Sequence, residues 1–96
     1  NIRRRFLLGK FNEMGLKTFE PRGAFYVFPS VESTGLTGEQ FAEGLLRSKK
    51  VAVVPGSAFG ESGKYFVRCS YATSLTELKT AVERIKEYLV GIGADK

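Results

Sequence analysis

Three stretches of the chain place apolar residues at the spacing of an amphipathic helix. The first covers residues 2–14 and ends at Gly15, the second follows Thr37, and the third runs from Leu75 to near Gly91. The apolar side of each predicted helix consists of Leu7, Phe11 and Met14; Phe41, Leu45 and Leu46; and Leu75, Leu78, Val82, Ile85 and Leu89. Two capping boxes, Thr37 with Gln40 and Ser74 with Glu77, predict where the second and third helices begin.

Four further segments are rich in strand-forming residues: "LKTFEP", stopped by Pro21; "GAFYVFP"; "VAVVPG", halted at Pro55; and "YFVRCSYATS", residues 65–74. In the second segment, alternation puts Phe25 and Val27 on one face, and Ala24, Tyr26 and Phe28 on the other. The resulting order, αββαββα, predicts an α+β domain: a small, largely antiparallel sheet with helices packed on one face. The other face of such a sheet is left for water or for another domain.

Composition fits one small globular domain over residues 1–96, because the chain is long enough for a single core only. Much of its net charge of +5 comes from Arg3, Arg4, Arg5, Lys49 and Lys50, which do not form one long stripe and have no interleaved aromatics. This favours a solvated basic surface over a nucleic-acid-binding stripe. No apolar run approaches the roughly 20 residues that span a membrane. The single cysteine favours a reducing, cytoplasmic location.

Several chemical sites are disfavoured by the residues present. The chain has no histidine and one cysteine, so neither a zinc site nor the commonest general base is expected. The loop "PGSAFGESGK" is not a Walker A motif, since Ala58 stands where its first glycine is required and Tyr65 where Ser or Thr is required. We interpret this loop as a flexible turn between two strands.

Possible nucleophiles lack the partners that would activate them. Neither Ser57 nor Ser70 has a histidine to act as its base, and Cys69 alternates with apolar residues as a core residue does. Lys64 is expected to be solvated. No pair of carboxylates converges by spacing, so hydrolytic acid–base chemistry is not indicated.

Arg68 is unusual because it lies within a segment that otherwise reads as a buried strand. Period-two alternation places it with Phe66 and Ser70 on one face, opposite Val67 and Cys69. If Val67 faces the helices, Arg68 projects from the uncovered face. It then either pairs with an internal acid such as Glu20 or is solvated, or it acts as a rigid fork for a ligand carboxylate. The spacing alone leaves these alternatives open.

The first residues suggest that a longer helix preceded them. Three arginines occupy the first turn of the predicted helix, where positive charge opposes the helix dipole. A simple hypothesis is that this helix began earlier in a longer chain.

Three motifs occur in order along the sequence: P-x-G-A-F-Y, V-x-V-x-P-G-x-x-F-G and R-x-S-Y-A. In this order they resemble the C-terminal small domain of class I/II (fold type I) pyridoxal-phosphate aminotransferases, most of all aspartate aminotransferase-like enzymes. The resemblance covers essentially all 96 residues. It implies that Arg68 stands where the family binds the α-carboxylate of an amino acid or a 2-oxo acid. It also implies that the first helix is the tail of the family's interdomain helix.

The resemblance further implies which parts of the enzyme lie outside this chain. The residues that bind pyridoxal 5'-phosphate (PLP), including the lysine, belong to the family's large domain, so no residue here is assigned to catalysis, to the cofactor or to a metal. The isolated chain is expected to be inactive. The full-length enzyme is expected to be a cytoplasmic homodimer without nucleic-acid or membrane partners, whose small domain closes over substrate with Gly23 and residues 56–63 as flexible points. The alternatives are a non-catalytic interaction domain, or the same domain of a PLP-dependent lyase, decarboxylase or synthase.

Overall fold

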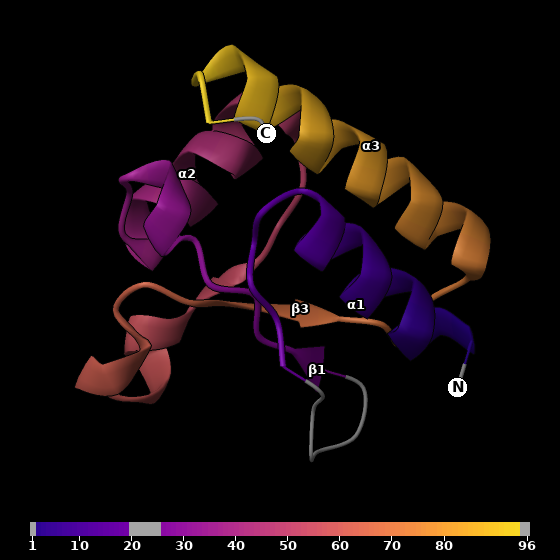
Figure 1. Cartoon of the computed structure of the whole chain (residues 1–96), viewed down its shortest axis with the longest axis horizontal. Helices are drawn as coiled ribbons and strands as arrows, with labels where there is room; N and C mark the ends of the chain where they lie inside the picture. The colour runs from indigo at the N-terminus through magenta and orange to yellow at the C-terminus, as the bar shows by residue number, and fades with distance from the viewer. Residues whose placement is uncertain (1, 20–25, 95–96) are drawn as a thin grey trace.

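Three helices lie on one side of a short three-stranded sheet in the computed structural model, which describes residues 2–19 and 26–94 (Figure 1). The helices and strands are α1 (Ile2–Glu13), β1 (Tyr26–Val27), α2 (Gly38–Lys49), β2 (Val54–Pro55), β3 (Val67–Ser70) and α3 (Leu75–Gly91). Three short 3-10 turns are η1 (Glu32–Thr34), η2 (Gly56–Phe59) and η3 (Glu61–Gly63). The predicted α+β class is therefore confirmed.

The sheet has the order β1-β3-β2, and both pairings are antiparallel. Tyr26 lies opposite Ser70, while Val54 lies opposite Arg68 on the other side of β3. An isolated bridge between Ser30 and Phe66 continues the β1–β3 register beyond the end of β1. Because β3 lies between the other two strands, its residues are held on both sides.

The strands are shorter than the sequence predicts. In "VAVVPG" only Val54 and Pro55 form a strand, and both are partly buried. In "LKTFEP" residues 16–19 form no strand, although the Ser30 amide donates a hydrogen bond to the Lys17 carbonyl at 2.8 Å. Residues 20–25, which include Pro21, Gly23, Ala24 and Phe25, lie outside the described part of the chain. Parts of the segments that were predicted as strands from their strand-forming residues are therefore irregular in the structure.

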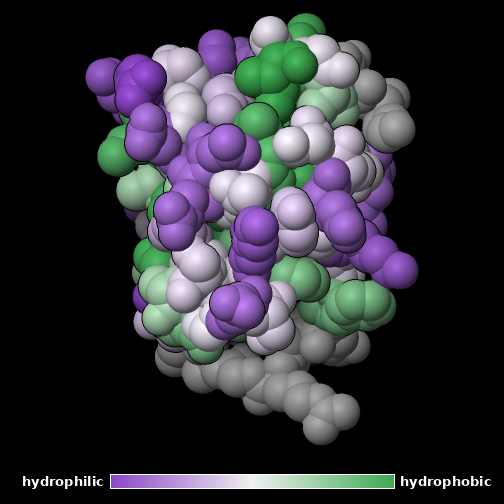
Figure 2. All heavy atoms as spheres, turned by 90° about the vertical axis from the view of Figure 1, so that its left-hand side faces the viewer, coloured by the Kyte–Doolittle hydropathy of each residue, from purple (hydrophilic) through white to green (hydrophobic). Residues whose placement is uncertain are grey.

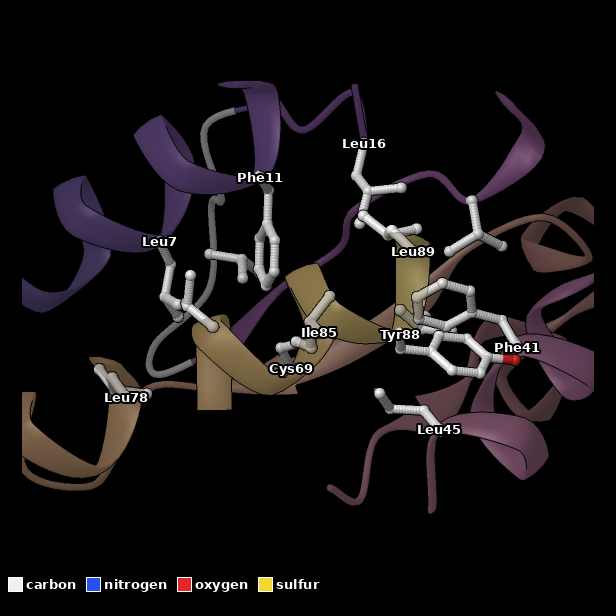
Figure 3. Packing of buried hydrophobic residues seen from close by; sticks show 14 of the residues in the cluster. Leu7, Phe11, Leu16, Phe41, Leu45, Cys69, Leu78, Ile85, Tyr88 and Leu89 are labelled. Atoms are coloured by element: carbon white, nitrogen blue, oxygen red, sulfur yellow. The ribbon is translucent and has the colours of Figure 1, made fainter. Parts of the chain in front are cut away.

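The core lies between the helices and the inner face of the sheet (Figure 3). Leu7 and Phe11 of α1 point towards α3 and towards Cys69 of β3. Across the core, the rings of Phe41 and Tyr88 meet edge to face, with centroids 5.3 Å apart. Most of the apolar residues predicted for α1 and α3 are buried, and Tyr88 is an additional buried residue, whereas Met14, just after α1, and Leu75 are only partly buried. Leu46 of α2 is an exception, because 51% of it is exposed.

The helix ends agree with most of the capping predictions. Gly15 follows α1 in a left-handed conformation (φ 84°), as expected for a glycine that ends a helix. Both hydrogen bonds of the Thr37–Gln40 capping box are present. At Ser74 the hydroxyl accepts from the Glu77 amide, and the Glu77 carboxylate accepts from the Thr73 and Ser74 hydroxyls.

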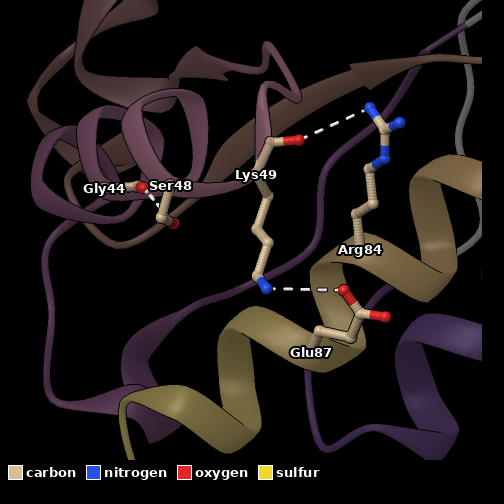
Figure 4. Close-up of polar contacts among 5 residues, drawn as sticks. All are labelled: Gly44, Ser48, Lys49, Arg84 and Glu87. Carbon is tan, nitrogen blue, oxygen red and sulfur yellow. Dashed lines mark hydrogen bonds and ion pairs between the residues drawn. The ribbon is translucent and has the colours of Figure 1, made fainter.

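Polar contacts join the end of α2 to α3 (Figure 4). The Lys49 ammonium lies 3.4 Å from the Glu87 carboxylate, and Arg84 donates to the Lys49 carbonyl at 3.5 Å. A cation at the C-terminal carbonyls of a helix interacts favourably with its dipole. These contacts link the C-terminal end of α2 to α3 at the surface.

The molecular face formed by α2 and the loop of residues 56–63 mixes hydrophilic residues with smaller hydrophobic patches (Figure 2). Leu46 of α2 and Phe59 of η2 are among the exposed hydrophobic residues. Within the described residues, no helix has both the length and the apolar character needed to cross a membrane.

Candidate functional site

Arg68 projects from the side of β3 that the helices do not cover. Its neighbours Val67 and Cys69 are buried in the core, whereas Arg68 is partly exposed and Ser70 is exposed. The predicted alternation along this strand is therefore confirmed. Because β3 is the central strand, the backbone that carries the guanidinium is paired on both edges.

Two aromatic rings contact the Arg68 guanidinium. Its Cζ atom lies 4.2 Å from the ring centroid of Tyr26 and 4.6 Å from that of Phe59. Tyr26 comes from β1 and lies diagonally across the ladder from Arg68, since its direct partner is Ser70. Phe59 comes from η2, in the connection between β2 and β3. Both distances are within the range of cation–π contacts.

Phe28 completes this aromatic group. The register that pairs Tyr26 with Ser70 and Ser30 with Phe66 places Phe28 opposite Arg68. The Phe28 ring meets the Phe59 ring edge to face, at a centroid distance of 6.4 Å and an interplanar angle of 89°. We refer to Tyr26, Phe28 and Phe59 as the aromatic cluster.

The hydrogen-bonding edge of Arg68 has no carboxylate within ion-pair distance among residues 2–19 and 26–94. Within the same ranges, no side-chain hydrogen bond involves its guanidinium. Glu20, the internal partner that the sequence suggested, lies outside the described residues. Aromatic contacts occupy the faces of a planar cation and leave its N–H groups available in the plane.

The other candidates from the sequence have structural contacts. The Ser57 hydroxyl donates to the Glu39 carboxylate at 2.9 Å, and the Ser70 hydroxyl accepts from the Ala72 amide at 3.1 Å. Burial raises the pKa of the Cys69 thiol to about 12, which makes it a poor nucleophile. Lys64 is exposed and lies over the ring of Tyr65.

The loop of residues 56–63 is more regular than the turn that the sequence predicted. It forms η2 and η3, and the Gly56 amide donates to the Phe66 carbonyl at 2.7 Å. A Cβ atom on Gly56 would lie 2.4 Å from the Gly63 carbonyl oxygen, so the two backbones approach as only glycine allows. This close contact positions η2, and with it Phe59.

The family model of class I and II aminotransferases matches residues 1–85. The chain belongs to this family. It is 51% identical to an aspartate aminotransferase of Pyrococcus abyssi over 87 residues. This match covers 91% of this chain and 22% of the relative. The crystal structure of an aromatic aminotransferase from Pyrococcus horikoshii superposes with a TM-score of 0.93 at 47% identity, over 97% of this chain and 25% of that one.

This aminotransferase chain thus spans about a quarter or less of the length of the relatives it matches. A PLP-bound protein of Clostridium difficile 630 is also similar, with 28% identity and a TM-score of 0.83 over 92% of this chain and 23% of that one. PLP is the cofactor that membership of the family implies.

The described residues do not fit PLP by themselves. A phosphate ester needs clustered donors, and the cofactor's aldehyde needs a lysine held inside the site. A groove of about 510 Å³ between α1 and α3 does carry Lys10, Lys79 and Lys86, but Glu13 and Glu83 share its rim. It also lies on the helical side of the sheet, away from Arg68.

Proposed function

We propose that this chain is the substrate-binding and closing domain of a PLP-dependent aminotransferase. In the complete protein, Arg68 binds the α-carboxylate of an amino acid, aspartate or a similar one, and of the 2-oxo acid that exchanges the amino group with it. The observation that carries this proposal is the position of the Arg68 guanidinium: it projects from the uncovered sheet face, with two aromatic rings against it and no described carboxylate beside it.

An arginine suits this role because of its geometry. The guanidinium presents parallel N–H groups that match the two oxygens of a carboxylate. A central strand is a more rigid mount for such a fork than a loop. When one end of the substrate is fixed in this way, its reacting carbon is held in a defined orientation, and positioning of this kind supplies several kcal/mol of the barrier reduction.

The rest of the protein would provide what this chain does not hold. We place the PLP-binding residues in a large domain that faces Arg68, with this chain as the C-terminal small domain of one subunit of a cytoplasmic homodimer. The length of the relatives supports this division, since the chain corresponds to only 22% of the aspartate aminotransferase. The exposed aromatic cluster supports it as well, because apolar groups on a sheet face favour burial against another domain. The isolated 96-residue chain is expected to have no transaminase activity.

The Arg68→Lys variant of the complete aminotransferase tests this function. A lysine retains the charge but not the paired hydrogen bonds, so we expect KM for the amino acid to rise by about 10- to 100-fold, with a lower kcat. Arg47→Lys is the matched control: Arg47 is exposed on α2 and pairs with Glu43 on the same helix, so its replacement should leave the kinetics unchanged. Kinetics of Arg68→Lys equal to those of the wild type, for substrates with an α-carboxylate, would remove Arg68 from this role.

A further inference from the structure

Arg68 is partly exposed, yet two aromatic rings contact its guanidinium. A solvated arginine side chain has several rotatable bonds and visits many orientations. Contacts at 4.2 Å and 4.6 Å, from rings on two different elements, restrict the guanidinium to the orientations in which both rings meet it. Among the described residues, none accepts a hydrogen bond from its N–H groups, which leaves these groups for another partner.

Each ring is itself held in place by the fold. Tyr26 is fixed by the β1–β3 register, which sets it diagonally across from Arg68 on the same face of the sheet. Phe59 is fixed by η2, whose first residue, Gly56, is bonded to Phe66 and packs directly on Gly63. Phe28 supports Phe59 through an edge-to-face contact. The fold therefore sets the backbone positions from which both rings reach the arginine.

We infer that Tyr26 and Phe59 are positioning residues, which hold the Arg68 guanidinium in the orientation that receives a planar carboxylate. They act through Arg68 and need not touch the substrate. The inference rests on the proposed function and deepens it, since it assigns two residues on separate elements to the affinity for any substrate that carries an α-carboxylate.

The size of the effect follows from the nature of the contact. Cation–π contacts range from weak at exposed sites to several times stronger when solvent is excluded. The loss of either ring is expected to raise KM for the amino acid by about 3- to 30-fold. The effect should fall on KM more than on kcat if the ring acts mainly on the capture of the carboxylate.

The experiment compares ring-removing with ring-retaining substitutions in the complete aminotransferase. Tyr26→Leu and Phe59→Leu keep an apolar side chain but remove the ring, whereas Tyr26→Phe and Phe59→Tyr keep it. We expect a raised KM for the first pair and near-wild-type kinetics for the second. Circular dichroism and the melting temperature establish that each variant is folded.

Tyr65→Leu is the matched control for Tyr26→Leu. The two tyrosines are almost equally exposed, at 38% and 39%, and each lies against a cation, but the cation at Tyr65 is Lys64. Tyr65→Leu should leave KM unchanged. A rise in KM for Tyr65→Leu as large as that for Tyr26→Leu would overturn the inference, because the effect would then not depend on Arg68.

A double-mutant cycle separates positioning from a general structural role. In the Arg68→Lys background there is no planar group to orient, so the further loss caused by Tyr26→Leu or Phe59→Leu should shrink to less than about 2-fold. The same full loss in both backgrounds would contradict the inference. A second readout uses a primary amine that has the side chain of the amino-acid substrate but no α-carboxylate. The rate at which the enzyme slowly converts this amine should be the same with and without either ring.

The outcomes distinguish the inference from the proposed function. If Arg68→Lys leaves the kinetics unchanged, the proposed function fails and the inference fails with it. If Arg68→Lys raises KM while Tyr26→Leu and Phe59→Leu behave like the wild type, only the inference fails. Raised KM values in the ring-removing variants, together with coupling to Arg68, support both.

Discussion

Adjacent residues of β3 have opposite chemistry because they face opposite sides of the sheet. Arg68 projects from the uncovered face, while Cys69 lies in the core beneath α1 and α3. A one-residue shift of the register would exchange the two. The charged arginine would then enter the core and the thiol would become exposed, so the pairing of Tyr26 with Ser70 maintains both the core and the candidate site.

The burial of Cys69 predicts slow reaction with thiol reagents. Burial raises its pKa to about 12, whereas an unfolded cysteine titrates near 8.5, so at pH 8 the native protein holds about 10³-fold less thiolate. We expect labelling by an aromatic disulfide to be slower by at least this factor in native protein than in denaturant. The colour released over time measures both rates. Rapid labelling without denaturant would show that Cys69 is accessible.

Helix α3 illustrates how a local signal sets an element boundary. The Ser74 hydroxyl accepts a hydrogen bond from the Glu77 amide at 3.1 Å, which satisfies one of the free N–H groups of the first turn. Hydrogen bonds from the Thr73 and Ser74 hydroxyls also lower the pKa of Glu77, so this carboxylate remains ionised near the positive end of the helix.

The Ser74→Ala variant is expected to be less stable by about 1 kcal/mol, because the first turn of α3 loses its cap. Thr76→Ala is the control on the same helix: Thr76 is exposed, and alanine has the higher helix propensity, so this variant should be as stable as the wild type or slightly more stable. Chemical denaturation measures both free energies of unfolding. Equal stabilities of Ser74→Ala and the wild type would mean that the hydrogen bond contributes nothing.

Helices were predicted from the sequence more accurately than strands. A helix of 17 residues such as α3 repeats its apolar pattern several times, and capping residues mark its start. The strands have two to four residues each, and their ends depend on partners distant in the sequence. Alternation alone predicted that Arg68 lies on the opposite side of β3 from Val67 and Cys69. The contact of Arg68 with Phe59 could not be predicted, because it depends on the path of the 56–63 loop.

The exposure of Leu46 has a similar origin. It lies next to the buried Leu45, and at helical spacing the two side chains diverge by about 100°. Whether both are buried is decided by the packing of α2 against α3 and β3. The contact between Tyr26 and Arg68, in contrast, could have been predicted from the sequence. An antiparallel pairing of "GAFYVFP" with "YFVRCSYATS" can place Tyr26 on the same face as Arg68.

At the scale of the whole molecule, one face of the sheet forms the core and the other carries the candidate site. The inner face carries Val27, Val67 and Cys69 into the core under the helices. The outer face carries Arg68 and the aromatic cluster, and η2 extends this face beyond the strands. The core therefore determines the geometry of the candidate site through short connections, among them the close contact between Gly56 and Gly63.

The Gly56→Ala variant tests this dependence of the site on the fold. An added Cβ would lie 2.4 Å from the Gly63 oxygen and 2.8 Å from the Phe66 oxygen, and both are backbone atoms that move only if the loop moves. We expect a loss of stability of about 1–3 kcal/mol, as for other overpacked sites. We also expect a higher KM for the amino acid, because Phe59 lies three residues further along and would shift relative to Arg68.

Gly9→Ala is the matched control for this variant. No heavy atom lies within 4 Å of the added Cβ on Gly9, which is exposed within α1, so alanine should stabilise the protein by about 0.5–1 kcal/mol and leave KM unchanged. Denaturation and steady-state kinetics of both variants separate the two effects. If Gly56→Ala lost stability but kept its KM, the contact between Phe59 and Arg68 would not depend on the packing of the loop. The core would then influence the position of Arg68 only through β1 and Tyr26.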